Sequence, residues 1–319
     1  MDGADAELAA LGLEHYDAGD DPALSFVRHG ENTTYRVDGA RGAWALRVHR
    51  PGYRSADEVR SEVAWMEALQ TAGIRTPTAV RTVQGDVVAE LATDAGPRLV
   101  SAMTWEPGEP LSDADDAAAW RGLGELMGRV REHGKAWQPP ERFRRWAWDA
   151  QGMLGPDPHW GDPALLPDWD AEALAVLNAV RDRVRARLAA FGDGPDRWGL
   201  VHGDLAFHNV LVGEGGTVLI DFDDAGWSWC MWELGVALAP FDGRPGFADR
   251  RDALVAGYRS ACDVSEDELA ELPTFVMARR LVTLGWVLTH AETQHAQAQR
   301  AWRIATFPDA ARAYLAATA

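Results

Sequence analysis

The stretch from Gly199 to Trp227, GLVHGDLAFHNVLVGEGGTVLIDFDDAGW, carries the pattern that decides the fold. Two short apolar runs, NVLV and TVLI, flank the turn residues GEGG, which predicts a β-hairpin. Asn209 begins the first run, Asp204 comes five residues before it, and Asp221 follows the second run. Because the turn reverses the chain, we expect Asn209 and Asp221 at the same end of the hairpin.

These residue types suit the transfer of a phosphoryl group from MgATP to a hydroxyl. One carboxylate can orient the hydroxyl and accept its proton, and Mg²⁺ prefers amide and carboxylate oxygens as ligands. The spacing from Asp204 to Asn209 is that of the protein-kinase catalytic loop, and Asp221-Phe222 stands where kinases have Asp-Phe-Gly. The spacing therefore predicts a base at Asp204 and magnesium ligands at Asn209 and Asp221. The alternative is that these residues only cap a turn.

The composition narrows the class of protein. The net charge of −18 argues against a nucleic-acid partner and permits a cationic substrate. Two cysteines, Cys230 and Cys262, support neither a disulfide framework nor a cysteine-based zinc site. No apolar run approaches the ~20 residues of a membrane span, and the start, MDGADAELAA, lacks the basic residues of a signal peptide. We therefore expect a cytoplasmic protein without a membrane partner.

The periodicity changes along the chain. Short β-rich runs cover most of residues 24–103, interrupted by one helical stretch at 55–73 with Ser55 as its N-cap. Later stretches have helical periodicity, and they lie at 112–134, 171–191, 248–262, 266–294 and 301–316. The segment MTWEPGEPLSD breaks both periodicities, which predicts a junction there.

The combined pattern HGD…N…DFDD resembles the signature of aminoglycoside and choline-kinase-like phosphotransferases. Kinase-like homoserine kinases and bacterial stress-response Ser/Thr kinases are similar. GENTTYRV, RRLVTLGWVLTH and the segment from Ala45 to Leu69 resemble the same family, so nearly the whole chain is covered. The resemblance implies an α+β, protein-kinase-like two-lobed fold. A small antiparallel-sheet N-lobe with one main helix would bind nucleotide (residues 1–105). A larger, mainly helical C-lobe would hold the catalytic loop, the metal site and the acceptor (residues 106–319).

The resemblance also assigns roles to residues of the signature. Asp204 matches the catalytic base, and Asn209 and Asp221 match the magnesium ligands. His202 matches the residue that braces the catalytic loop. Asp223 matches a second acid that contacts the metal or its water. The implied cofactors are ATP and Mg²⁺.

The nucleotide clamp departs from the family. The family places a lysine on the third strand, paired with a glutamate on the next helix. Here Arg47 takes the strand position, Glu62 is the best-placed partner, and the only lysine of the chain is Lys135. Arginine can also contact phosphate oxygens, so we expect the clamp to persist. Asn32 is expected to contact nucleotide near a turn that lacks the usual glycines.

The resemblance does not identify the molecule that accepts the phosphoryl group. The loop reads HGDLAFHN, so Ala206 removes a usual histidine and His208 replaces a usual glycine. The aromatic side chains of the 146–160 segment could hold a cationic or sugar-like acceptor, although such clusters more often pack in a core. The candidates for acceptor contact are His208, Asp224, Trp148, His159 and Trp160.

The expected activity is therefore phosphoryl transfer to a hydroxyl of a small molecule, such as an aminoglycoside, an amino alcohol or a hydroxy amino acid. A Ser/Thr protein kinase of the same fold is one alternative. A degenerate kinase-like protein without turnover is a second, because the usual lysine is missing. A zinc or iron hydrolase using His202, Asp204, His208 and Asp221 is a third.

Overall fold

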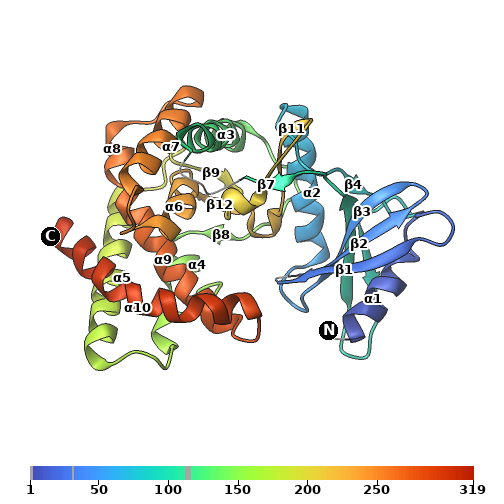
Figure 1. Ribbon diagram of the computed structural model, residues 1–319, viewed down its shortest axis with the longest axis horizontal. Helices are drawn as coiled ribbons and strands as arrows, with labels where there is room; N and C mark the ends of the chain where they lie inside the picture. Colours follow the sequence, from blue (N-terminus) through green and yellow to red (C-terminus); the bar gives the residue numbers. More distant parts are fainter. Residues whose placement is uncertain (1–2, 31, 112–115) are drawn as a thin grey trace. The chain divides into compact units, whose positions relative to one another are not determined.

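The computed structural model describes residues 3–30, 32–111 and 116–319, and its contacts divide the chain into two compact units. Figure 1 labels the elements of both. The first unit comprises Met1–Pro110, Trp137–Arg145 and Val210–Asp223. The second unit comprises Leu111–Ala136, Trp146–Asn209 and Asp224–Ala319. The assignment of functions to an N-lobe and a C-lobe remains a prediction.

An antiparallel sheet of six strands forms the first unit, in the order β1-β2-β3-β6-β4 with β5 also paired to β6. Its strands are β1 (Ala23–His29), β2 (Asn32–Gly39), β3 (Gly42–His49), β4 (Ala79–Val80), β5 (Val88–Leu91) and β6 (Arg98–Thr104). All strand runs expected here are present, but the run around residue 80 forms only two ladder residues. Val37 of β2, Leu46 of β3 and Val100 of β6 are wholly buried and belong to one core cluster.

Helix α1 (Gly3–Leu13) covers one face of this sheet and was not expected from the sequence. Leu8, Ala9 and Leu13 join the core cluster that contains Leu46 and Val100. The helix shows almost no amphipathic pattern, because alanine and glycine fill much of its surface. Its position therefore depends on contacts with the sheet rather than on a readable periodicity.

Helix α2 (Ala56–Thr71) begins and ends close to the expected residues. Ser55 caps it, and Ser55 and Glu58 form a reciprocal capping box. Its inner face buries Val59, Val63 and Leu69. The same face carries Glu62, which is 1% exposed, so the helix fixes an acidic side chain inside the unit.

The hairpin predicted by the opening stretch is also present in the first unit. Strands β10 (Val210–Gly213) and β11 (Gly216–Leu219) pair antiparallel, and β7 (Glu109–Pro110) joins β10. The amide of Leu219 donates to the carbonyl of Arg75, which ties the hairpin to the end of α2. The hairpin thereby delivers Asp221 and Asp223 to the unit that contains Arg47 and Glu62.

The second unit is mainly helical. Its helices are α3 (Ala117–Ala136), α4 (Ala150–Leu154), α5 (Ala171–Phe191), α6 (Trp232–Leu238), α7 (Phe247–Ala261), α8 (Glu266–Ala270), α9 (Leu272–Thr289) and α10 (Gln294–Ala317). A small sheet in the order β8-β12-β9 is formed by β8 (Ala147–Trp148), β9 (Trp198–Val201) and β12 (Gly226–Trp229). Short 3-10 turns at Pro163–Leu165, Phe207–Asn209, Phe222–Asp224 and Ala239–Phe241 connect these elements.

Two glycines allow α3 and α7 to pack at close range. A Cβ atom at Gly124 would lie 2.0 Å from the Leu254 carbonyl oxygen, and one at Gly257 would lie 1.9 Å from that of Arg121. Each glycine thus faces the backbone of the other helix. No larger residue fits at either position without moving a helix.

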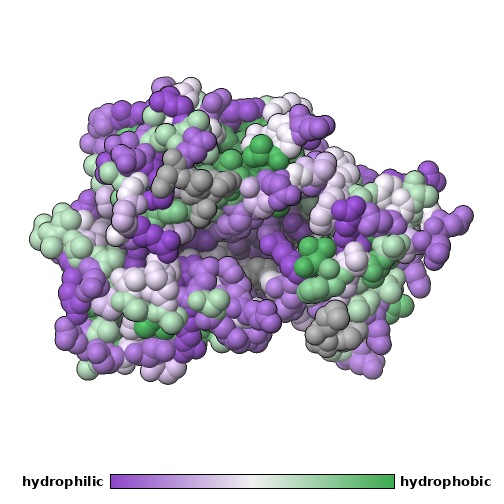
Figure 2. All heavy atoms as spheres, in the orientation of Figure 1, coloured by the Kyte–Doolittle hydropathy of each residue, from purple (hydrophilic) through white to green (hydrophobic). Residues whose placement is uncertain are grey.

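The architecture confirms the expected α+β kinase-like class, with local differences in the helices. The stretch expected at 266–294 is split into α8 and α9 at Glu271, and the last helix begins at Gln294 rather than near 301. Helical periodicity continues through such breaks, so it does not locate them. Every helix in the described segments is too short or too polar to cross a bilayer. The face drawn in Figure 2 is largely hydrophilic.

Candidate active site

Arg47 on β3 is the centre of a buried charge network in the first unit. Its Nη1 lies 3.2 Å from Oε1 of Glu62 and 3.5 Å from Oδ1 of Asp223, and its Nη2 lies 3.4 Å from Oδ1 of Asp221. Burial opposes the charge of Arg47, but Asp223, Asp221 and Glu62 raise its pKa above the ordinary value. The expected pair of Arg47 and Glu62 is therefore present, and the two acids that follow the hairpin join it.

The turn after β11 aims two carboxylates at this guanidinium. Asp221 has a φ of +68°, a conformation that costs a residue with a side chain about 1–3 kcal/mol and clusters at functional sites. Arg28 on β1 also contacts the Asp221 carboxylate, at 2.5 Å. Asn32 donates its amide to Asp223, and the Oδ1 of Asn32 is buried without a partner among the described residues.

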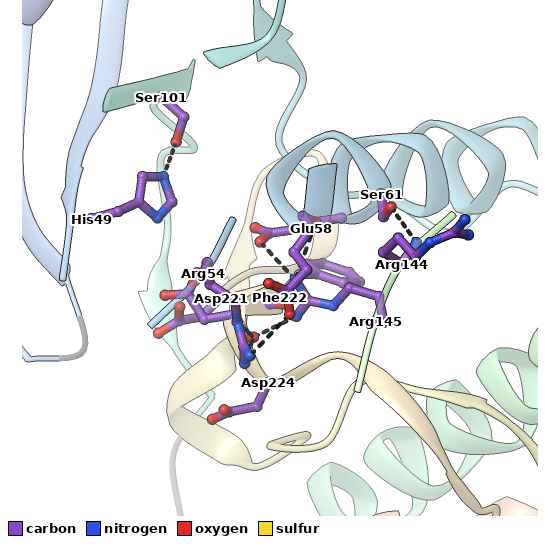
Figure 3. A network of polar contacts seen from close by, with 12 residues as sticks. His49, Arg54, Glu58, Ser61, Ser101, Arg144, Arg145, Asp221, Phe222 and Asp224 are labelled. Carbon is purple, nitrogen blue, oxygen red and sulfur yellow. Dashed lines mark hydrogen bonds and ion pairs between the residues drawn. The ribbon is translucent and has the colours of Figure 1, made fainter. Parts of the chain in front are cut away.

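Two further arginines hold the backbone of the same turn (Figure 3). Arg145 Nη2 donates to the carbonyl of Phe222 at 3.0 Å, and Arg54 Nε donates to that of Asp223 at 3.1 Å. The ring of Phe222 packs edge-on against Trp65, with centroids 5.6 Å apart. These contacts explain how the strained turn is kept in place.

Burial also shifts the charge of the carboxylate on α2. Desolvation, with the neighbouring Asp223, raises the pKa of Glu62 to about 7, although Arg47 and Arg145 act in the opposite direction. One oxygen of Glu62, Oε2, accepts no hydrogen bond among the described residues. Glu62 is therefore held by charge more than by hydrogen bonds.

The catalytic-loop candidates lie in the second unit, around Asp204. One oxygen of Asp204, Oδ1, pairs with Arg279 of α9, and the other lies 3.0 Å from the amide nitrogen of Asn209 and 3.4 Å from Nε2 of His208. Burial alone would raise the pKa of Asp204, but Arg279 and His208 hold it well below its usual range. The carboxylate is therefore ionised and fixed at both oxygens.

A buried glutamate holds the backbone of this loop. Glu233, in the first turn of α6, accepts hydrogen bonds from the backbone amides of His202, Gly203 and Leu205. His202 is wholly buried, and its Nδ1 accepts from the Asp204 amide at 3.3 Å. The bracing role expected for His202 remains a prediction. Burial raises the pKa of Glu233 to about 7, although the three amides favour its charged form.

The acceptor candidates fall into two groups. Trp148 is wholly buried and donates to the Asp224 carbonyl at 2.7 Å. His159 donates from Nε2 to the Ala147 carbonyl, and its ring stacks on Trp146. These contacts give Trp148, His159 and Asp224 a packing environment. Trp160 instead lies against the Arg279 guanidinium, and His208 is the exposed partner of Asp204. The last two lie beside the predicted base.

Sequence reasoning missed the arginines that pair with the predicted site. Arg279 lies in RRLVTLGWVLTH, and Arg145 lies in RRWAW. An arginine inside a long apolar helical run is unusual unless it is paired, and this signal could have identified Arg279. Arg28, Arg54 and Arg145 carry no comparable signal, because none of them lies inside a long apolar helical run.

Each unit carries oxygen atoms of the kind that a hard divalent cation prefers. In the second unit, the amide nitrogen of Asn209 is taken by Asp204, so its oxygen is the atom left for a cation. In the first unit, Asp221 and Asp223 carry carboxylate oxygens. Within the described segments, no three His, Cys, Asp or Glu side chains are grouped as metal ligands. That result gives no support to the hydrolase alternative.

Comparisons with known proteins identify the family of this chain. The model of the phosphotransferase enzyme family matches residues 24–272. A solved microcompartment-associated aminopropanol kinase is 31% identical, with a TM-score of 0.90 over 99% of this chain and 98% of that one. An uncharacterized protein of Deinococcus radiodurans is 31% identical over 88% of this chain and 81% of its own length. An amicoumacin kinase, solved in complex with AMP-PNP, Ca²⁺ and Ami, is 21% identical, with a TM-score of 0.77 over 97% and 93% of the two chains.

The chain therefore belongs to the phosphotransferase enzyme family, and it is a kinase-like phosphotransferase. The resemblance on which the sequence analysis depended is confirmed.

Proposed function

We propose that this protein transfers the γ-phosphoryl group of MgATP to the hydroxyl of a small amino alcohol. The observation that carries the proposal is the arrangement of Asp204, which is ionised, fixed by Asn209 and placed on a rigid loop. The similarity to an aminopropanol kinase over 99% of the chain favours an amino alcohol among the possible acceptors. The amicoumacin kinase with AMP-PNP and Ca²⁺ supports the use of ATP and a divalent cation.

The residues would act as follows. Asp204 accepts a hydrogen bond from the acceptor hydroxyl and takes its proton as the oxygen attacks the γ-phosphorus. The bond between the γ-phosphorus and the bridging oxygen breaks, and ADP leaves with the electron pair. Mg²⁺, when bound by Asn209, Asp221 and Asp223, supplies positive charge to the phosphate oxygens. Arg47, fixed by Glu62, and Asn32 contact the nucleotide, and His208 and Trp160 face the acceptor.

The acceptor is tested by measuring ADP release from MgATP with a panel of hydroxylated compounds. The panel contains 1-amino-2-propanol, ethanolamine, choline, an aminoglycoside, homoserine and a serine-containing peptide. We expect the highest kcat/KM with 1-amino-2-propanol or ethanolamine. A preference for the peptide would favour a protein kinase. No release with any acceptor, together with no rise of the Tm in MgATP, would favour a degenerate protein.

The roles are tested by two amide substitutions. Asp204→Asn keeps the size of the side chain but removes the base, so kcat should fall about 10²–10⁴-fold while the affinity for MgATP changes little. Asp221→Asn should reduce both turnover and the magnesium-dependent part of nucleotide affinity, measured as the shift of the Tm with and without EDTA. Near-normal turnover of Asp204→Asn would exclude Asp204 as the base.

A further inference from the structure

Among the described residues of the second unit, Arg279 is the arginine that pairs with the proposed base. It is 9% exposed, and its guanidinium lies 5.1 Å from the ring centroid of Trp160 and 5.8 Å from that of Trp232. Trp232 in turn donates to the Gly203 carbonyl at 3.1 Å, so one of these two rings is hydrogen-bonded to the loop that carries Asp204. The guanidinium is therefore held in one place beside the carboxylate.

Arg279 has hydrogen-bonding capacity to spare. One nitrogen, Nη2, pairs with Asp204, and the other, Nη1, is buried without an acceptor among the described residues. Its neighbour on α9, Arg280, is satisfied differently, because it lies on the Asp242 carboxylate and the Thr306 carbonyl. An unpaired buried N–H donor costs about 1–3 kcal/mol, so its retention at this place suggests an anion that arrives during the reaction.

The chemistry identifies that anion. The acceptor oxygen that hydrogen-bonds to Asp204 is the atom that attacks the γ-phosphorus, so the transferred group comes within one bond of it. Charge spreads over the three equatorial phosphoryl oxygens in the transition state, and a cation near them lowers the barrier. In the first unit, Arg47 is already surrounded by Glu62, Asp221 and Asp223. The three carboxylates offset the positive charge of Arg47, so a second cation near the acceptor would be needed to stabilise the negative charge on the phosphoryl oxygens.

We propose that Arg279 is a catalytic residue that donates hydrogen bonds to the phosphoryl group during its transfer. This inference rests on the proposed function. Before the reaction the guanidinium pairs with Asp204. When Asp204 has taken the hydroxyl proton, it is neutral, and the phosphoryl oxygens on the attacking atom become the anion nearest to Arg279. The P–O bond to the acceptor forms, the P–O bond to ADP breaks, and Arg279 keeps its proton throughout.

The test compares Arg279→Ala with Arg303→Ala, using ADP release from MgATP and the acceptor that the wild type uses best. Arg303 is the control, because its hydrogen bonds go to Thr283 and Gln299, and Asp204 acts on it through charge alone. Arg279→Ala should lower kcat about 10²–10³-fold, the cost of losing one transition-state donor, with the KM for ATP within about threefold of wild type. Arg303→Ala should remain within about threefold in both constants.

A chemical rescue distinguishes catalysis from a merely structural role. Removal of the side chain leaves a space between Trp160 and Trp232, so guanidinium chloride at low millimolar concentration should restore kcat of Arg279→Ala by about tenfold or more. Sodium chloride and ammonium chloride at equal ionic strength should not. Arg303→Ala should show no rescue. If the alanine variant does not fold, Arg279→Lys, which keeps the charge, replaces it, and its kcat and its KM for ATP are compared with those of wild type and Arg303→Ala.

Several outcomes would overturn the inference. They are a kcat of Arg279→Ala within about fivefold of wild type, a loss confined to the KM for ATP, or equal rescue by ammonium. If the wild type itself neither releases ADP nor gains thermal stability from MgATP, the proposed function fails instead.

Discussion

Arg47 stands where the family has a lysine, and the residues around it pair with its larger side chain. A lysine at this position would present a compact ammonium, whereas the planar guanidinium reaches Glu62 with one nitrogen and Asp221 with another. The resemblance to the family implied the pair of Arg47 and Glu62, because the two residues stand where the family has its lysine and glutamate. The contact with Asp221 depends on a hairpin more than 170 residues away in the chain, which local spacing does not place.

Arg47→Met should therefore weaken both nucleotide binding and the fold. Loss of a charge-assisted contact costs about 1.5–3 kcal/mol of nucleotide binding. Removal of the cation that Glu62, Asp221 and Asp223 share destabilises the fold by about 3–5 kcal/mol, although Arg145, Arg28 and Asn32 still contact these carboxylates. Arg47→Lys keeps the charge and should lie closer to wild type in both. The measurements are the KM for ATP and urea unfolding. Arg41→Met, on an exposed turn, is the control and should change stability by no more than about 0.5 kcal/mol. Wild-type behaviour of Arg47→Met would remove Arg47 from the clamp.

The helix pair α3 and α7 shows how an element can depend on single glycines. Gly124→Ala would place a methyl group against the Leu254 carbonyl, so we expect a loss of at least about 2 kcal/mol in the free energy of unfolding. Gly122→Ala lies on the same helix but faces open space, and it should stabilise by up to about 1 kcal/mol. Thermal and urea unfolding measure both. Equal effects of the two substitutions would mean that the helices pack less closely than described.

The elements also show which parts of the fold were predictable. Helix α2 was readable because its cap, its apolar stripe and its terminal glycine all agree. Helix α1 was not, because an alanine-rich surface has no clear apolar face. The break at Glu271 between α8 and α9 was missed because helical periodicity continues across it. The bracing role of Glu233 was missed because its partners are backbone amides, which no side-chain pattern reveals.

The pH dependence of stability is a property of the whole molecule. Burial raises the pKa of Glu62 and Glu233 to about 7, above the ordinary value of 4.5. The folded protein therefore holds protons that the unfolded chain releases between pH 4.5 and 7. The free energy of unfolding should fall as the pH rises through that window, by on the order of 3 kcal/mol for a group as buried as Glu233.

Glu233→Gln isolates this contribution, because the amide does not titrate. Urea unfolding between pH 5 and 8 should show a smaller decrease for Glu233→Gln than for wild type. Glu132→Gln, at an exposed position, is the control and should keep the wild-type dependence. If wild type and Glu233→Gln have the same pH dependence, Glu233 is not protonated in this range.

The path of the chain between the two units has a consequence for biosynthesis. The last segment of the first unit is residues 210–223. The ribosome makes this segment only after it has made two segments of the second unit, Leu111–Ala136 and Trp146–Asn209. Until Asp221 and Asp223 leave the ribosome, Arg47 has only Glu62 as its carboxylate partner, and Arg54 lacks the carbonyl that it holds in the finished protein. A nascent chain of 110 residues therefore lacks two of the three carboxylates that surround Arg47 in the finished protein. Its sheet is expected to mature only late in translation, and a gene cut at a single position would not yield either unit intact.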